Sequence, residues 1–290
     1  MTTAAATPQK TPRRNSAGLR RDLELLEVLG SAESVAAGGL GVNRLAQLVG
    51  RDKGQVSRTL ATLADSGLAA RDQSTLNYRL GYQLYALAAR TLESRLVREA
   101  TPYLRRVVTA LHETTHLCVF RSGSVLTLTS ETSEYAFRGL GWEGVSVAAW
   151  QTSAGRVLIS DWNDADLRRW YEAHGNDAAV TGPVAPELVQ TGNLPIVSDA
   201  GLRRVVTDAD TFLTEIHRIR THGYATVDEE FERGVVGVSA PVYDFRHNII
   251  AAINVSAPKT RLGGHLEQAG RVAARVAAEL STQLGAHQAR

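Results

Sequence analysis

Cysteine is almost absent from this 290-residue chain, in which Cys118 is the single example. One cysteine excludes a disulfide framework within the chain and any metal module built from several thiolates. Long apolar runs are absent as well, since no stretch approaches the roughly 18 uninterrupted apolar residues of a membrane span. The first sixteen residues lack the apolar core of a secretory signal. Together these absences predict a cytoplasmic protein.

Short catalytic signatures are also missing, because the chain contains neither a GxSxG nucleophile elbow nor a Walker A sequence. One literal match to a zinc-protease motif exists, HExxH at 112–116. That motif needs both histidines on one helical face, whereas here a helical pattern stops and a β-branched run begins. A zinc hydrolase using these histidines is therefore kept as a minor alternative, and the stretch is interpreted as a helix-to-strand junction.

A second partial match is GxGxxG at 139–144. The dinucleotide-binding fingerprint follows a strand and opens a helix, but this run precedes a strand-like segment. We interpret it as a glycine-rich loop, and we expect no catalytic residues, no bound metal and no cofactor.

Net charge is small, with 32 basic and 30 acidic residues giving +2, but the charge is unevenly distributed. Residues 1–81 contain 11 Lys and Arg against 7 Asp and Glu, while the remainder contains 21 against 23. The length suits one large or two ordinary domains. A basic N-terminal third on a slightly acidic body is typical of a DNA-reading head joined to a sensor.

The N-terminal third has the pattern of a winged helix-turn-helix. Leucines at helical spacing predict a first helix over 19–29, followed by a loop over 31–41, and two short helices are expected at 42–49 and 53–66. Two alternating runs around a turn-rich quartet predict a β-hairpin over 68–81. Residues 1–18 are expected to form a disordered basic tail.

The third helix separates its residues into two faces. Val56, Leu60 and Leu63 form the expected core stripe. The opposite face is polar, and arginine and glutamine can bind guanine and adenine bidentately. A solvated surface is the plainer interpretation of such a face. The predicted DNA contacts here are Arg51, Lys53, Gln55, Ser57, Arg58 and Thr62.

The hairpin adds three candidates for the phosphate backbone, Arg71, Asn77 and Arg79. Each could equally belong to a structural hairpin with polar surface residues. As a set, and next to the polar helix, they favour DNA.

The body mixes helices with apparently antiparallel strands, which predicts an α+β domain. Helices are expected at 82–98 (a linker), 99–111, near 152, at 207–221 and at 265–284; strands are expected at 116–120, 125–129, 145–149, 235–242 and 249–255. The last two strands should pair. The stretch 176–206 has no assignment.

Three small residues, Ser153, Ala154 and Gly155, open the helix near 152. Backbone N–H groups at such a helix start can approach a bound carboxylate closely. Ordinary capping by Thr152 or Ser153 is the commoner role of this pattern.

The sequence resembles the IclR-type bacterial transcriptional regulators over about residues 19–284. In the head the matching runs are 42–60, 63–68 and 78–81; in the body they are 152–158, 219–225, 228–235, 239–242 and 251–258. The resemblance implies a winged helix-turn-helix domain at 19–81, a linker helix at 82–98 and a GAF/PAS-like effector-binding domain at 99–290.

The same resemblance implies a ligand pocket in the body. Carried over position by position, its residues are Ser153, Ala154, Val227, Asp228, Gly237, Asn254 and Ser256. Family members that bind small oxo-acids can have a thiol or an acid where this chain has Gly237 and Val227. Losing both leaves more space and less polar contact, which favours a bulkier organic acid such as an aromatic carboxylate.

The sequence therefore predicts a repressor or activator of transcription that binds a pseudo-palindromic DNA operator and senses a small organic acid. The resemblance implies a homodimer, often paired into a tetramer. Besides the zinc hydrolase, a small-molecule-binding or scaffold protein that does not bind DNA remains an alternative.

Overall fold

The computed structural model describes residues 17–135, 142–180 and 202–286, which form two compact units that divide between Arg90 and Thr91. The predicted tail lies outside the described residues except for its last two, which begin the first helix. Of the glycine-rich run at 139–144, only 142–144 are described, and they lead into a strand. In the described part, no helix is both long and apolar enough to cross a membrane.

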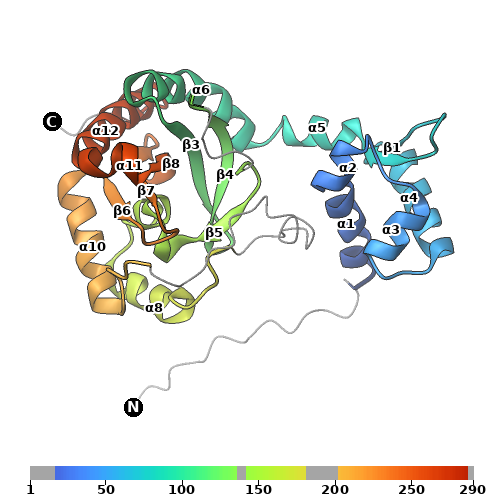
Figure 1. Ribbon diagram of the computed structural model, residues 1–290, viewed down its shortest axis with the longest axis horizontal. Coiled ribbons are helices and arrows are strands. Elements are labelled where there is room, and N and C mark those ends of the chain that lie inside the picture. The colour runs from blue at the N-terminus through green and yellow to red at the C-terminus, as the bar shows by residue number, and fades with distance from the viewer. Residues whose placement is uncertain (1–16, 136–141, 181–201, 287–290) are drawn as a thin grey trace, which may run out of the picture. The chain divides into compact units, whose positions relative to one another are not determined.

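The N-terminal unit contains the predicted three helices and hairpin together with two short helices (Figure 1). Its elements are α1 (Ala17–Leu29), α2 (Ala32–Ala36), α3 (Val42–Leu48), α4 (Lys53–Asp65), β1 (Ala69–Arg71), β2 (Tyr78–Leu80) and α5 (Tyr82–Ala88). Helix α2 lies in a segment expected to be a loop, and Ser31 caps it by accepting a hydrogen bond from the Ser34 N–H at 3.3 Å.

The core of this unit is formed by buried side chains of α1, α3, α4 and the hairpin, including Leu25, Leu29, Leu45 and Leu60. The leucine stripe of α1 is rotated from the predicted one. Leu19 and Leu23 are exposed, because the helix packs through its C-terminal half. An apolar surface is therefore left on α1.

The prediction of one linker helix over 82–98 is wrong in one respect, because the helix is interrupted between Ala88 and Leu92. Helix α5 ends at Ala88, and α6 (Leu92–Leu111) is a new helix. Thr91 caps α6 by accepting a hydrogen bond from the Ser94 N–H at 3.3 Å. No residue of α5 is buried.

The C-terminal unit is built on one curled antiparallel sheet of mixed α+β type, as expected. Its strands are β3 (Thr114–Arg121), β4 (Ser124–Glu131), β5 (Ser146–Ala148), β6 (Ala225–Asp228), β7 (Val235–Tyr243) and β8 (Ile249–Pro258), in the order β5-β4-β3-β8-β7-β6. Strands β7 and β8 pair as predicted, and β6 was not anticipated.

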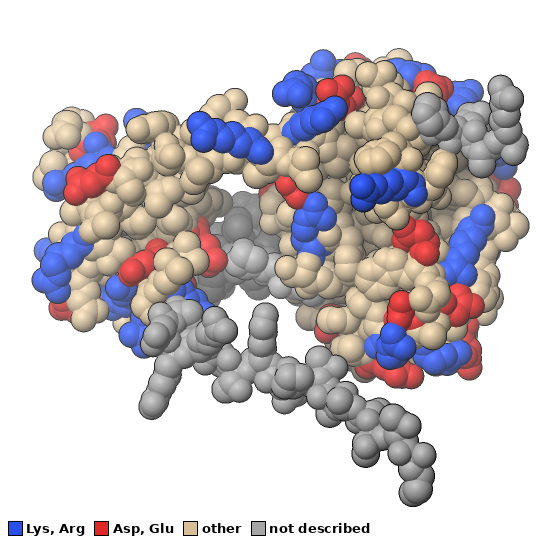
Figure 2. Space-filling view, turned by 180° about the vertical axis from the view of Figure 1, so that it is seen from behind, with Lys and Arg blue, Asp and Glu red and all other residues tan. Residues whose placement is uncertain are grey.

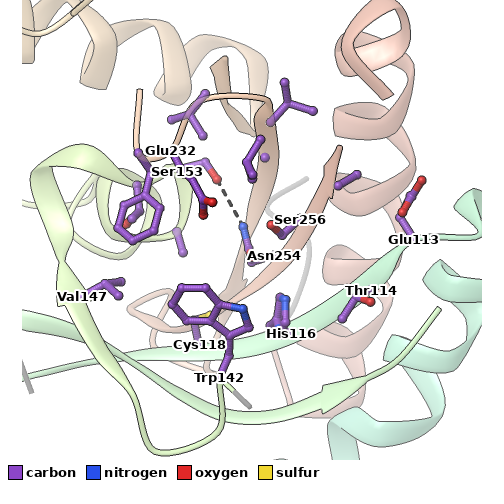
Figure 3. A pocket seen from close by; sticks show the side chains of 18 of the residues that line it. Glu113, Thr114, His116, Cys118, Trp142, Val147, Ser153, Glu232, Asn254 and Ser256 are labelled. Atoms are coloured by element: carbon purple, nitrogen blue, oxygen red, sulfur yellow. Dashed lines mark hydrogen bonds between the residues drawn. The ribbon is translucent and has the colours of Figure 1, made fainter. Parts of the chain in front are cut away.

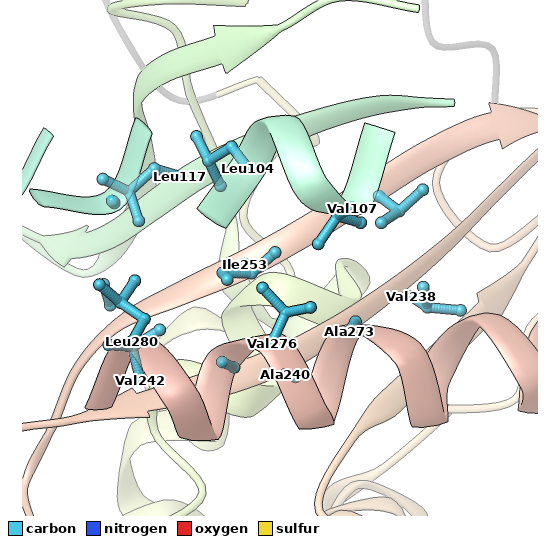
Figure 4. Packing of buried hydrophobic residues seen from close by; sticks show 14 of the residues in the cluster. Leu104, Val107, Leu117, Val238, Ala240, Val242, Ile253, Ala273, Val276 and Leu280 are labelled. Carbon is cyan, nitrogen blue, oxygen red and sulfur yellow. The ribbon is translucent and has the colours of Figure 1, made fainter. Parts of the chain in front are cut away.

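Helices cover both faces of this sheet. Figure 4 shows side chains of α6 and α12 (Leu266–Gln283) meeting those of β7 and β8 in the larger core. The second core lies on the other face, against α7 (Ser153–Leu158), α8 (Asp164–His174) and α10 (Ala209–His222). Successive residues of β3 alternate between the two cores, with Leu117 in the first and Cys118 in the second.

Charged side chains are mixed over the C-terminal unit. On the face shown in Figure 2, Lys and Arg are interspersed with Asp and Glu, and no extended patch of one sign is visible on that unit. Such a face does not select a polyanion.

Candidate functional site

Helix α4 exposes the polar face that the sequence predicts. Asp52 caps the helix by accepting a hydrogen bond from the Gln55 N–H at 3.0 Å, and Val56 and Leu60 are fully buried. Burial of that stripe turns the opposite face to solvent. Gln55, Arg58 and Thr62 are exposed on that face, and Lys53 and Ser57, which flank it, are exposed as well.

Arg51 was also predicted to contact DNA, but the structure gives it internal partners. Its guanidinium donates to the Arg21 carbonyl at 2.8 Å and to Asp22 Oδ1 at 3.1 Å. Its side chain is only 15% exposed. Arg51 therefore ties α1 to the turn before α4, and its position does not support a role as a DNA ligand.

The hairpin presents Arg71 and Arg79 on its exposed surface. Asn77 is instead engaged within the unit, because its amide donates to the Gly39 carbonyl at 3.3 Å. Asp72 organises the turn by accepting from the Ser74 hydroxyl at 2.6 Å and from the Thr75 N–H at 2.8 Å. These hydrogen bonds, that of Ser74 first, hold the pKa of Asp72 well below its usual range.

A cavity of about 530 Å³ lies in the C-terminal unit, between the sheet and α7. Six of the seven predicted ligand residues lie in its wall: Ser153, Ala154, Val227, Gly237, Asn254 and Ser256. The exception is Asp228, which lies outside that wall and forms ion pairs with Lys259 at 2.8 Å and Arg203 at 3.0 Å. The structure therefore does not support Asp228 as a ligand residue.

Hydrogen bonds link the polar residues at the middle of the cavity (Figure 3). Asn254 lies opposite Ser239 in the β7–β8 register, and its amide N–H group donates to the Ser239 hydroxyl at 2.9 Å and to the Ser153 hydroxyl at 3.2 Å. The two serine hydroxyls are 2.8 Å apart. This network joins the start of α7 to two strands and holds the wall in one arrangement.

Three residues of β3 that the sequence did not single out as ligand contacts also line the cavity, Thr114, His116 and Cys118. Burial lowers the pKa of His116 to about 4, so the ring is neutral at pH 7, and its Nδ1 lies 2.8 Å from the Ser130 hydroxyl. Burial raises the pKa of the Cys118 thiol to about 12. The part of the wall that His116 and Cys118 form, called the floor of the cavity below, is thus polar but uncharged at pH 7.

An aromatic pair forms part of the wall. The rings of Trp142 and Phe231 meet edge to face with centroids 6.1 Å apart, and Val125 and Val147 line the same cavity. Such surfaces accept a flat apolar ring. Neither aromatic residue has a distinctive local sequence signal.

The HExxH residues have other roles in the structure. His112 ends α6 at a positive φ of 57° and His116 lies in β3, so the predicted helix-to-strand junction is present. Glu113 is buried and forms a bidentate pair with Arg261 at 2.5 and 2.6 Å. Within the described ranges, no group of three or more His, Cys, Asp or Glu side chains is placed to hold a metal ion.

A buried ion pair secures the segment that follows β6. Arg156 of α7 is 1% exposed, and its guanidinium donates to Glu230, which is 7% exposed, at 2.6 Å. Arg156 also donates to the Trp150 carbonyl at 2.9 Å. Because Glu230 directly precedes Phe231 and Glu232 of the cavity wall, this pair positions that wall.

Comparison with known proteins places the chain among regulators. The family profile described as Bacterial transcriptional regulator IclR C-terminal matches residues 89–186 and 198–281. The chain is 26% identical to the HTH-type transcriptional regulator BhcR of Paracoccus denitrificans, over 86% of this chain and 81% of that protein. It is 25% identical to the HTH-type transcriptional regulator KdgR of Escherichia coli, over 91% and 90%.

A solved structure with the same fold is an IclR homolog from Microbacterium hydrocarbonoxydans complexed with 4-hydroxybenzoate. It superposes with a TM-score of 0.69 at 19% identity, covering 92% of this chain and 97% of that one.

Proposed function

The chain belongs to the IclR family of bacterial transcriptional regulators, and on this premise we propose how its two units share the task. It is an effector-sensing, DNA-binding regulator of transcription, and the relatives named above are HTH-type transcriptional regulators. In the proposal, the N-terminal unit binds a pseudo-palindromic operator and the cavity of the C-terminal unit holds a small organic acid. The protein acts in the cytoplasm.

The observation that carries the DNA assignment is the exposed polar face of α4, whose opposite face is fixed by burial of Val56 and Leu60. Gln55, Ser57 and Arg58 would read bases, while Lys53 and the hairpin arginines would bind phosphates. Thr62 lies one turn further along the same face. Arg51 and Asn77 support this surface from inside the unit instead of contacting DNA.

Fluorescence anisotropy on the DNA upstream of the protein's own gene, at two salt concentrations and against a scrambled duplex, tests this proposal. Tight, sequence-selective binding with a steep salt slope is expected. Replacing Arg58 with Ala should weaken specific binding by about 1–3 kcal/mol. Replacing Arg20, an exposed arginine of α1, is the matched control. Equal affinity of Arg58→Ala and wild type would contradict the proposed contact.

A random-duplex selection should follow if the upstream fragment is not bound. An empty selection would favour the alternative of a binding module without DNA affinity.

Replacing Lys53 with Ala should lower the affinity for all DNA sequences by a similar factor, in contrast to Arg58→Ala. It should also reduce the slope of log affinity against log salt concentration by about 1.

We also propose that the protein is a homodimer, paired further into a tetramer, through surfaces that include the exposed apolar residues of the N-terminal unit. Leu19 is 64% exposed and Tyr85 is 80% exposed, and Leu23 and Tyr82 are exposed as well. A second copy of the same unit would cover them and set the spacing of two half-sites. Tyr85→Glu should shift the species seen by sedimentation velocity towards monomer, while Gln83→Glu serves as the control.

The effector assignment rests on the cavity, which combines a polar, uncharged floor with an aromatic wall. Its size suits a small organic acid with a ring, and an aromatic carboxylate is the leading candidate. Addition of the effector should change operator affinity only to the extent that it favours one DNA-binding arrangement. Anisotropy titrations with a panel of carboxylic acids test this directly.

A further inference from the structure

The charged residues of the cavity wall are not all paired. Glu113 and Arg261, both in the wall, neutralise each other through their bidentate pair. Arg233 is exposed at the wall and His116 is neutral. Glu232 is different, because its carboxylate lines the cavity and has no ion-pair or hydrogen-bond partner among the residues that the structure describes.

Desolvation raises the pKa of Glu232, and among the described residues no cation opposes that effect. A carboxylate in this position gains from a ligand that brings it a hydrogen-bond donor. It is disfavoured by a ligand that brings it a second negative charge.

The neighbouring amide strengthens this preference. The N–H group of Asn254 is directed to three protein acceptors, namely Ser153, Ser239 and the Val238 carbonyl at 3.3 Å. An amide has two N–H hydrogens and one carbonyl oxygen, so the part of Asn254 that is left for a ligand is the accepting oxygen. Figure 3 shows Glu232 and Asn254 on the same side of the cavity as Ser153.

His116 and Thr114 lie beside Asn254 and Ser256, their partners in the β3–β8 register, and Figure 3 shows Trp142 next to them. A flat ring placed against Trp142 and Phe231 would therefore share the cavity with the hydrogen-bond acceptors of Glu232 and Asn254. This arrangement rewards a ring substituent that donates a hydrogen.

We propose that Glu232 is the specificity-determining residue of this cavity and accepts a hydrogen bond from the hydroxyl group of an aromatic effector, with the Asn254 carbonyl as a second acceptor. The inference rests on the proposed function, in which this cavity is the effector site. It further requires that a ring with a carboxylate in place of that hydroxyl is rejected, because two carboxylates would then meet in a partly desolvated site.

Isothermal titration calorimetry with four ring compounds tests the proposal on the full chain. The probes are benzoate, its 3-hydroxy and 4-hydroxy derivatives, and benzene-1,4-dicarboxylate. For wild type, we expect at least one hydroxybenzoate to bind about 10- to 100-fold more tightly than benzoate, the range for a hydrogen bond to a charged acceptor. The dicarboxylate should bind more weakly than benzoate.

Three variants isolate the carboxylate. In Glu232→Ala the preference for the hydroxyl should fall below about threefold, and in Glu232→Gln the dicarboxylate should gain affinity relative to benzoate. Glu143→Gln is the matched control, because Glu143 is an exposed acid that acts on His116 through space but does not line the cavity. It should leave both ratios unchanged.

Ratios between two ligands on one variant cancel any general loss of folded protein. If Glu232→Ala does not fold, Glu232→Gln alone decides through the dicarboxylate ratio. The proposal is overturned if no probe binds wild type, or if the ratios are the same in wild type and in the Glu232 variants. Operator binding without any probe bound would leave the regulator assignment intact. Ligand discrimination without DNA binding would support the role of Glu232 and contradict the assignment as a DNA-binding regulator.

Discussion

Removal of Glu230 is expected to destabilise the C-terminal unit more than removal of any surface acid. Arg156 is almost completely buried, and Nη1 of its guanidinium has no hydrogen-bond partner among the described residues. Glu230→Ala would leave a buried cation with only the Trp150 carbonyl. Breaking such a pair from one side costs about 3–5 kcal/mol.

This cost can be measured in the relevant unit alone. All four tryptophans, at 142, 150, 162 and 170, belong to the C-terminal unit, so their fluorescence reports its unfolding. For a unit of this size, roughly 2–4 °C of melting temperature correspond to each kcal/mol, so a decrease of roughly 6–20 °C is expected. Effector affinity should fall as well, since Glu230 positions Phe231 and Glu232.

The control is Glu131→Ala, which breaks the exposed pair with Arg105 and should cost about 1 kcal/mol or less. The double replacement of Arg156 by Met and Glu230 by Leu should recover most of the lost stability, because no uncompensated charge remains. A melting temperature for Glu230→Ala equal to that of Glu131→Ala would refute the reasoning.

Three further outcomes are expected. The pKa of His116 is about 4 in the folded protein and about 6.5 in the unfolded chain, so the unfolded chain binds more protons between these two pH values. The free energy of unfolding should therefore decrease by about 3 kcal/mol from pH 6.5 to pH 4. Urea titrations at several pH values should show a smaller decrease in His116→Gln. Cys118, buried and with a pKa of about 12, should resist alkylation by iodoacetamide at pH 8 in native protein and react fully in urea, as read by mass spectrometry; rapid native labelling would contradict its placement. A Cβ at Gly237 would lie 3.3 Å from Ser153 Oγ and from Val227, so Gly237→Val should reduce affinity for a ring ligand roughly tenfold in calorimetry while operator binding is kept; unchanged affinity would place the ligand elsewhere.

Elements with a strong local pattern were predictable from the sequence. Helix α4 has a capping Asp52, a core stripe of Val56, Leu60 and the partly buried Leu63, and a closing glycine, and the β7–β8 pair has long β-branched runs. The break before α6 also had a local signal, since Thr91 and Ser94 have the spacing of a cap. It was missed because the apolar pattern continues across it.

Elements that depend on distant contacts were not predictable. Helix α8 buries only Leu167 and Trp170, too few to produce a clear periodicity. Strand β6 is four residues long and is defined by its pairing with β7. Such elements take their structure from the surfaces they cover.

The residues of the candidate site also fall into those that could be predicted from the sequence and those that could not. Ser153, Asn254 and Ser256 could be placed by resemblance because they lie in matched runs of sequence. The roles of Arg51 and Glu232 could not, because both depend on partners far away in the chain or on the lack of one. A sequence pattern identifies a charged residue, but not what neutralises it.

The alternation along β3 also bears on how such a sensor can acquire a new ligand. Thr114, His116 and Cys118 line the cavity, while Leu117 and Val119, which point to the other face of the strand, pack into the larger core. The positions that line the cavity are thus separate from those that pack into the larger core, although Cys118 also packs in the second core. Random substitution of Thr114 and His116 alone would create a library whose members keep both cores, and biosensors for other ligands could be selected from it.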